Sequence, residues 1–330
     1  MRNKKLLLPL LALVVAAGAV AVGFFAAQLV PEPVTVQASE TSAQTGQADE
    51  SGFDGTVYLD GREYVQRHDL TTVLFLGIDQ SEPVTVSEVT GEMGRSDVML
   101  VLVLDDTNKT MQVLQISRDT MVNVDVYDEN DVLAISMFMQ ITMQYSFGGS
   151  AKRSCWQTKN KVSELLYGVP IDSTVSFVMD GIAPVTDALG GVKITFRQGD
   201  TEVDPAFTEG ASAVLNGAQA EQFIRYRDTA VTDSNSTRMS RQMRFVQALY
   251  RQLAQGDVTS AIATFQDAAQ PYLTADLDAD TLDKLAHYTL NADMLTVPGA
   301  TKEGEYHDEY YVDEDALRRL VVQLFYIPAG

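Results

Sequence analysis

The side chains best suited to chemistry in this sequence are two carboxylates and an arginine at the ends of three short apolar runs. Each run has the length and the β-branched or large residues of a buried strand. The runs span residues 73–78, 98–104 and 111–116. Asp79 follows the first run, Asp97 precedes the second, and Arg118 follows the third, directly before Asp119. Carboxylates hold divalent cations and arginine holds phosphate oxygens, so this combination indicates a site for a metal-bound phosphate.

The connection between the second and third runs determines whether these groups meet. It reads DDTNKT, a polar tight turn that makes an antiparallel hairpin. Such a hairpin places the start of its first strand next to the end of its second. We therefore expect Asp97 and Arg118 to meet at one edge of a sheet, and Asp79 to join them if its strand runs parallel to the third.

A second group of basic side chains lies further along the chain. Arg225 and Arg227 are two residues apart and share one face of an extended backbone. The next predicted helix carries Arg238, Arg241 and Gln242 at relative positions i, i+3 and i+4 in its first two turns. With Arg244, five arginines fall within twenty residues of an acidic protein, beside the free N–H groups of a helix start. This pattern favours a phosphate-binding role over a merely solvated arginine face.

Composition excludes several classes of protein. The formal charge of −21 argues against binding to nucleic acid, which requires a basic surface. Cys155 is the one cysteine, so the chain has no intramolecular disulfide and no paired-cysteine metal site. His68, His287 and His307 are scattered along the chain and none lies within the motif stretch 71–120, which argues against a Ser-His-Asp or Cys-His hydrolase.

The N-terminus has the pattern of a membrane anchor. Residues 1–5 contain three positive charges, and residues 6–30 contain none of either sign. A helix of that length spans more than the ~30 Å hydrocarbon core of a bilayer. The positive charges place residues 1–5 in the cytoplasm and the remainder outside. A cleaved signal peptide is the alternative, although its apolar region is normally shorter. Residues 31–52 are polar and predict a flexible linker before one extracytoplasmic domain at 53–330.

The middle of the chain predicts the fold class. Helical and strand patterns alternate there, at 152–167, 174–179, 181–189 and 192–196. Alternating helices and strands around a hairpin indicate an α/β/α sandwich with a mixed central sheet. The methionine-rich run 133–147 is expected to pack in the core, and contact with lipid is the alternative.

Several short motifs, taken in order, resemble those of the LytR-CpsA-Psr family. They read LFLGID, GRSDVMLVLVL, ISRDT, GVPID, DALGGV, LNGAQA, IRYRD and TRMSRQ. The resemblance runs from about Thr71 to the C-terminus. It implies an extracytoplasmic phosphotransferase that moves a glycopolymer, such as wall teichoic acid or capsular polysaccharide, from a polyprenyl-pyrophosphate carrier to peptidoglycan.

The resemblance also implies roles for individual residues. Asp79 and Asp97 take the part of the ligands to Mg²⁺ or Mn²⁺, and Asp97, Arg118 and Asp119 form the catalytic group. Asp119 either accepts the proton of the incoming sugar hydroxyl or orients Arg118. The pyrophosphate is bound by Arg118, Arg225, Arg227, Arg238 and Gln242.

Two other functions remain open on the sequence. The first is a phosphatase that hydrolyses lipid pyrophosphates with the same groups and water as the acceptor. The second is a membrane-anchored, non-enzymatic module that binds polyprenyl lipid or cell-wall polymer. The two aspartates favour an enzyme, because a binding site for anions gains nothing from adjacent carboxylates.

Overall fold

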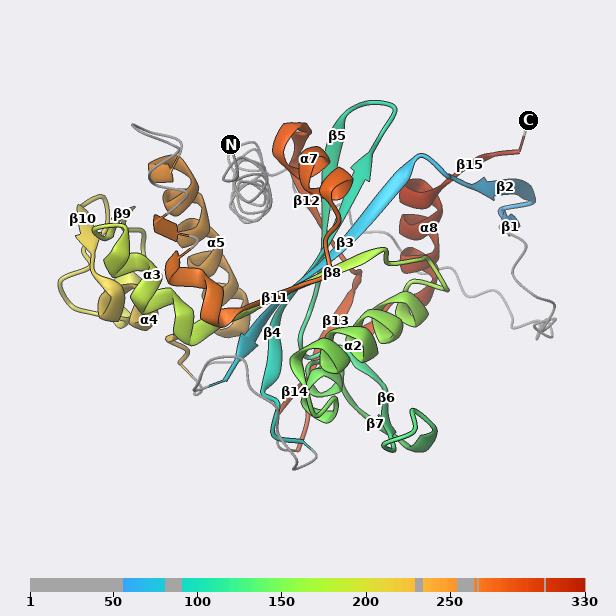
Figure 1. Ribbon diagram of the computed structural model, residues 1–330, viewed down its shortest axis with the longest axis horizontal. Helices are drawn as coiled ribbons and strands as arrows, with labels where there is room; N and C mark the ends of the chain where they lie inside the picture. Colours follow the sequence, from blue (N-terminus) through green and yellow to red (C-terminus); the bar gives the residue numbers. More distant parts are fainter. Residues whose placement is uncertain are drawn as a thin grey trace, which may run out of the picture.

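The computed structural model describes residues 56–80, 91–228, 234–253, 264–265, 267–305 and 307–329 (Figure 1). The predicted tail 1–5, anchor 6–30 and linker 31–52 lie outside these ranges. Within them, no helix is both long enough and apolar enough to cross a bilayer.

A mixed six-stranded sheet forms the centre of the fold, in the order β11-β8-β3-β4-β5-β12. Its strands are β3 (Leu70–Asp79), β4 (Arg95–Asp105), β5 (Thr110–Ile116), β8 (Ser173–Val178), β11 (Leu273–Ala275) and β12 (Thr289–Thr296). β4 pairs antiparallel with both β3 and β5, whereas β3 and β8 are parallel, as are β5 and β12. The three predicted strands and the hairpin between the second and third are thus confirmed. β3, β5 and β8 all end at the same edge of the sheet, where β4 begins.

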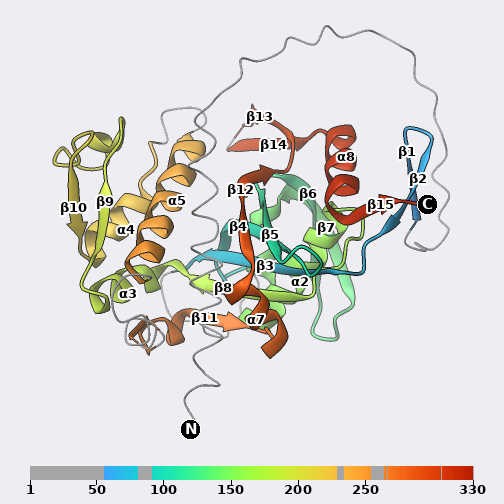
Figure 2. The ribbon, with the colours of Figure 1, turned by 90° about the horizontal axis from the view of Figure 1, so that it is seen from above.

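Helices cover both faces of this sheet (Figures 1 and 2). On one face, α2 (Ala151–Leu165) and α8 (Glu314–Phe325) pack against the alternate residues of β3 and β4 that include Leu74 and Val101. On the other, α3 (Ile182–Ala188), α5 (Ser234–Leu253) and α7 (Ala279–His287) contribute to a second core. A mixed sheet with helices on both faces confirms the predicted fold class.

A smaller core lies beside the main sheet and carries the second arginine group. It contains the hairpin of β9 (Val192–Thr195) and β10 (Ser212–Leu215), together with α4 (Gly217–Arg225). Phe196, Phe207 and Phe223 pack with one another there, and Phe245 of α5 joins the same cluster. Because α5 contributes to this core and to that of the main sheet, it links the two.

The methionine-rich run divides into two parts with different environments. Ile141–Phe147 forms a 3₁₀ helix, η2, which is largely buried as predicted. The preceding residues form β7 (Leu133–Gln140), which pairs with β6 (Met121–Tyr127) and is mostly exposed. The expectation of core packing is therefore wrong for β7, because β6 and β7 make a separate hairpin outside the main sheet.

The remaining elements form small sheets and short turns. β1 (Thr56–Leu59), β2 (Arg62–Gln66) and β15 (Tyr326–Pro328) make one sheet, and β13 (Gly299–Glu303) and β14 (Asp308–Val312) make another. Three short 3₁₀ turns are η3 (Met179–Gly181), η4 (Asp200–Glu202) and η5 (Gln270–Tyr272).

Candidate active site

Asp97 lies at a β-bulge between β3 and β4. Gly77 pairs with Val98 and Ile78 pairs with Ser96, so Asp97 is the extra residue on β4. A bulge interrupts the regular alternation of side chains and re-aims the extra residue. Gly77 makes the close approach possible, because a Cβ there would lie 2.9 Å from the Cβ of Val98.

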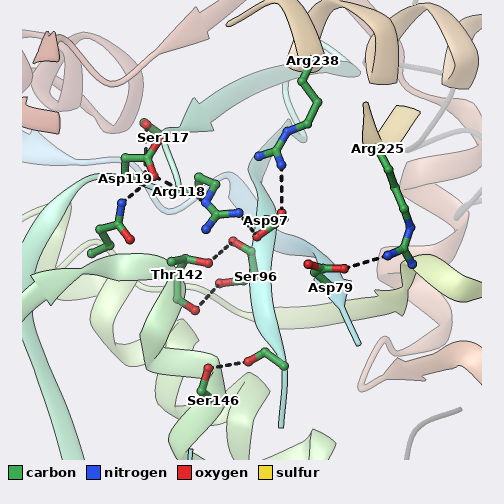
Figure 3. A network of polar contacts seen from close by, with 12 residues as sticks. Asp79, Ser96, Asp97, Ser117, Arg118, Asp119, Thr142, Ser146, Arg225 and Arg238 are labelled. Carbon is green, nitrogen blue, oxygen red and sulfur yellow. Dashed lines mark hydrogen bonds and ion pairs between the residues drawn. The ribbon is translucent and has the colours of Figure 1, made fainter. Parts of the chain in front are cut away.

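The bulge is held in place by η2. Thr142 donates its hydroxyl to the carbonyl oxygen of Ser96 at 3.1 Å, and Ser96 donates back to the Thr142 carbonyl at 3.4 Å. Ser146 donates to the carbonyl oxygen of Gly94 (Figure 3). These bonds fix the backbone on either side of Asp97.

Asp97 joins two arginines from distant parts of the chain. Arg118 donates from Nη1 to Oδ1 of Asp97, and Arg238 donates from Nη1 to Oδ2 at 3.2 Å (Figure 3). All three side chains are nearly buried, with 5%, 11% and 9% of their surface exposed for Asp97, Arg118 and Arg238. The predicted meeting of Asp97 and Arg118 is confirmed, and Arg238 of α5 joins them.

Asp119 is held close to this group by Gln140. Gln140 donates from Nε2 to Oδ1 of Asp119 at 2.6 Å and to the carbonyl oxygen of Asp308 at 2.9 Å. Arg118 lies 3.4 Å from the same carboxylate, between Nε and Oδ1. Burial raises the pKa of Asp119, and the nearby charges of Arg118, Arg227 and Arg238 oppose that rise. Asp119 is thus a buried carboxyl group with an increased affinity for a proton.

Asp79 belongs to a second cluster at the same edge. Arg225, the last residue of α4, donates from Nη1 to Oδ1 of Asp79 at 2.9 Å. It also donates to Asp180, which follows β8, and its Nε lies 3.1 Å from Oε1 of Glu221. Asp79 thus forms an ion pair with Arg225, in a cluster beside the one that contains Asp97 and Arg118. The side chains of this cluster are 27–49% exposed, whereas the Asp97 cluster is nearly buried.

Arg227 connects the arginine group to β14. It donates from Nη2 to Oδ2 of Asp308 at 3.0 Å. The carbonyl oxygen of Asp308 is the one that Gln140 binds. Arg227 directly, and Asp119 through Gln140, are therefore both linked to Asp308 at the start of β14.

Arg241 and Gln242 fix the end of α4. Arg241 is 2% exposed and donates to the carbonyl oxygens of Phe223 and Tyr226. Gln242 donates from Nε2 to the Ile224 carbonyl at 3.3 Å. These contacts join α5 to the segment that carries Arg225 and Arg227, so Arg241 has a structural role in place of the phosphate contact that the sequence suggested. The predicted contact of Gln242 with pyrophosphate stays a prediction.

Arg244 also has a structural partner. It pairs with both carboxylate oxygens of Asp200, each at 2.6 Å, and lies over the ring of Phe223. Of the five arginines in the sequence cluster, Arg225, Arg227 and Arg238 face the strand ends. Arg241 and Arg244 instead bind backbone carbonyl oxygens and Asp200, and so stabilise the fold around α4 and α5.

Sequence reasoning missed Asp180, Gln140 and Asp308. Asp180 lies two residues after the end of β8, and Asp79 is the last residue of β3, so the same rule of position could have found Asp180. Gln140 and Asp308 are brought to the site by the β6–β7 and β13–β14 hairpins. No local pattern in the sequence identifies either residue.

Comparisons with known proteins show the family and the fold to which this chain is similar. The family model LytR_cpsA_psr matches residues 33–324. A TagU teichoic acid transferase of Halalkalibacterium halodurans is 28% identical over 223 residues, which cover 67% of this chain and 66% of that protein. The crystal structure of Bacillus subtilis TagU covers 78% of this chain and 95% of its own, with 20% identity and a TM-score of 0.54. A structure of TagT bound to LIIa-WTA covers 78% of this chain and 90% of its own, with 20% identity and the same TM-score of 0.54. This chain belongs to the LytR_cpsA_psr family.

Proposed function

We propose that this protein transfers a glycopolymer, of the teichoic acid or capsular type, from a polyprenyl-pyrophosphate carrier to peptidoglycan and leaves a phosphodiester link. It acts outside the cell, from a domain held to the membrane by the N-terminal segment. Family membership and the curated name of the TagU relative, a polyisoprenyl-teichoic acid–peptidoglycan teichoic acid transferase, support this activity. The observation that carries it is the Asp97 carboxylate between Arg118 and Arg238, at the edge where β3, β5 and β8 end.

The charge pattern supports a diphosphate as the bound group. Arg118, Arg238 and Arg225 each use a carboxylate as their counter-ion. Guanidinium groups bind phosphate oxygens through paired N–H donors, so a pyrophosphate can replace these carboxylates on the arginines. The carboxylates would then be available to a cation that accompanies the diphosphate.

We propose Mg²⁺, or Mn²⁺, as that cation. Within the described ranges no three His, Cys, Asp or Glu side chains gather as a metal cluster. Two carboxylates are nevertheless sufficient for Mg²⁺, which completes its shell with water and phosphate oxygens. Asp79 and Asp97 stand on neighbouring strands at the same edge and fit this donor set. When bound, the ion would neutralise charge on the pyrophosphate.

Asp119 is suited to accept a proton from the acceptor. A sugar hydroxyl of peptidoglycan attacks the phosphorus that bears the glycopolymer, the P–O–P bond breaks, and polyprenyl monophosphate leaves. The hydroxyl proton passes to Asp119, whose raised pKa favours that transfer. Arg118, Arg227 and Arg238 hold the two phosphates and stabilise the charge that develops on the leaving group.

The test is the release of polyprenyl monophosphate from a pyrophosphate-linked donor by the full chain, with peptidoglycan present or absent. We expect release that depends on both the acceptor and Mg²⁺, and that is lost in Asp97→Ala and Arg118→Ala. Equal release without acceptor would identify the phosphatase instead. Tight binding of donor without turnover would identify the binding module. Unchanged turnover in EDTA would exclude the role given to the metal.

A further inference from the structure

The β6–β7 hairpin exposes an unusual amount of apolar surface. Val132, Leu133, Ile135 and Phe138 have 59%, 52%, 53% and 59% of their surface exposed. Trp156 of α2 is 42% exposed and contacts Tyr127 of β6 edge-on, with ring centroids 6.0 Å apart. Among the described residues, most of the exposed large apolar side chains lie in this patch, which we call the hairpin patch (Val132, Leu133, Ile135, Phe138 and Trp156). A cluster of exposed apolar side chains of this kind marks a contact surface.

Both faces of the hairpin contribute to the patch. Ile135 pairs with Val126 and Phe138 pairs with Asn123, and these two cross-strand pairs point to opposite faces because side chains alternate along a strand. In Figure 1 the hairpin projects from the body of the molecule beyond α2. A flat protein partner covers one face of such a hairpin. A fluid medium such as a lipid surface contacts both.

The charge around the hairpin also fits a lipid surface. The turn carries Asp128, Glu129 and Asp131, and Arg153 of α2 lies 2.8 Å from Asp131. With Lys152, Lys159, Lys161 and Glu164 of the same helix and Asp125 of β6, the hairpin and α2 carry five acidic and four basic side chains, a net charge of −1 in a chain whose formal charge is −21. This region is thus repelled less by an anionic bilayer than the rest of the protein. The charged turn limits the contact to the depth of the head groups, where tryptophan and tyrosine are favoured.

The base of the hairpin lies at the candidate active site. β6 begins at Met121, directly after Arg118, Asp119 and Thr120, and β7 ends at Gln140, which binds Asp119. Contact of the hairpin patch with the membrane would therefore fix the height of the site above the bilayer. A polyprenyl-linked pyrophosphate is confined to that surface by its tail.

We propose that the hairpin patch rests on the surface of the lipid bilayer and positions the active site over the head groups of its lipid-linked donor. The inference rests on the membrane location in the proposed function. The hairpin patch contacts the phospholipids of the bilayer, whereas the lipid-linked donor binds in the active site.

Trp156 provides a direct test because it is the one tryptophan in the chain. The full chain is reconstituted into nanodiscs of phosphatidylcholine and phosphatidylglycerol, with or without phospholipids brominated at a shallow or a deep position of the acyl chain. Residues 6–30 contain no tryptophan, so quenching reports on the patch alone. We expect a loss of Trp156 emission in brominated discs, greater for the shallow bromines. The double variant Ile135→Gln/Phe138→Gln should reverse this loss.

Val214→Gln is the matched control. Val214 is 60% exposed on β10 and lies outside the hairpin, so its replacement should leave the quenching unchanged. Equal Trp156 emission in brominated and plain discs would overturn the proposal, as would quenching that the double variant does not reduce. Donor turnover is measured in the same discs. Turnover without quenching refutes the hairpin contact alone, whereas quenching without turnover supports the contact and counts against the proposed transferase.

Discussion

Replacement of Asp97 by asparagine should separate the structural from the catalytic role of the site. The substitution removes the one carboxylate that joins Arg118 and Arg238, and it leaves both guanidinium groups nearly buried. Loss of one partner from a buried ion pair costs about 3–5 kcal/mol. Arg118 keeps Asp119 as a second partner, so we expect the lower end, about 3 kcal/mol. For a domain of this size that corresponds to a decrease in Tm of about 5 °C.

Asp79→Asn is the matched comparison, because it removes the same charge from the same edge of the sheet. The side chain of Asp79 is 49% exposed, and its partner Arg225 also contacts Asp180 and Glu221. The cost of losing such an exposed pair is about 0–1 kcal/mol. Both variants should lose Mg²⁺-dependent transfer, but only Asp97→Asn should unfold at a markedly lower temperature.

The assay is thermal unfolding of the full chain in detergent, followed by circular dichroism and repeated with inorganic pyrophosphate. Pyrophosphate should restore part of the stability of Asp97→Asn, since it supplies the two arginines with a counter-ion. Equal Tm values for Asp97→Asn and the wild type would refute the argument that this carboxylate neutralises two buried arginines.

Three further predictions concern the surroundings of the site. Arg241→Gln should raise the KM for donor about tenfold, a loss of ~1.4 kcal/mol in binding, with a smaller change in kcat. The reason is that Arg241 no longer binds the carbonyl oxygens of Phe223 and Tyr226, which hold the segment that carries Arg225. Arg251→Gln, on the exposed side of α5, is the control. Gln140→Leu should move the acid limb of the kcat/KM–pH profile to higher pH, because it removes a hydrogen bond that stabilises ionised Asp119, and a limb at unchanged pH would exclude Asp119 as the base. Burial already raises the pKa of Asp119. The contribution of Asp119 to the stability of the fold is therefore greatest at low pH and is lost as the pH rises through its folded-state pKa. Treatment with EDTA should abolish turnover, with recovery on addition of Mg²⁺ or Mn²⁺ and not of Na⁺, and recovery by any added salt would indicate simple screening.

Local patterns were sufficient to predict the centre of the fold. The three apolar runs are strands because their β-branched and large side chains are buried on both faces of a covered sheet. The polar turn after β4 left an antiparallel hairpin as its one solution, and that geometry brings Asp97 to Arg118. The apolar pattern of β7, by contrast, led to a wrong prediction of burial. Leu133, Ile135 and Phe138 are as apolar as core residues, and nothing local distinguishes an exposed hairpin from a buried one.

The arginine cluster shows the same limit. Their spacing in the sequence identified the five arginines as a group. It could not distinguish the three that face the strand ends from Arg241 and Arg244, which have structural partners. Arg241 and Arg238 are three residues apart on one helix, yet Arg238 reaches Asp97 while Arg241 reaches the carbonyl oxygens of Phe223 and Tyr226.

The sequence by itself determined that the strands β3, β4 and β5 form, that a hairpin joins β4 to β5, and that carboxylates and arginines accompany these strand ends. Those features depend on the preferences of neighbouring residues and on the geometry of a short turn. Only the tertiary structure decided which arginine meets which carboxylate and that Gln140 and Asp308 belong to the site. Such contacts join residues separated by as many as 168 positions, and their partners are set by how α5 and the two hairpins pack against the sheet.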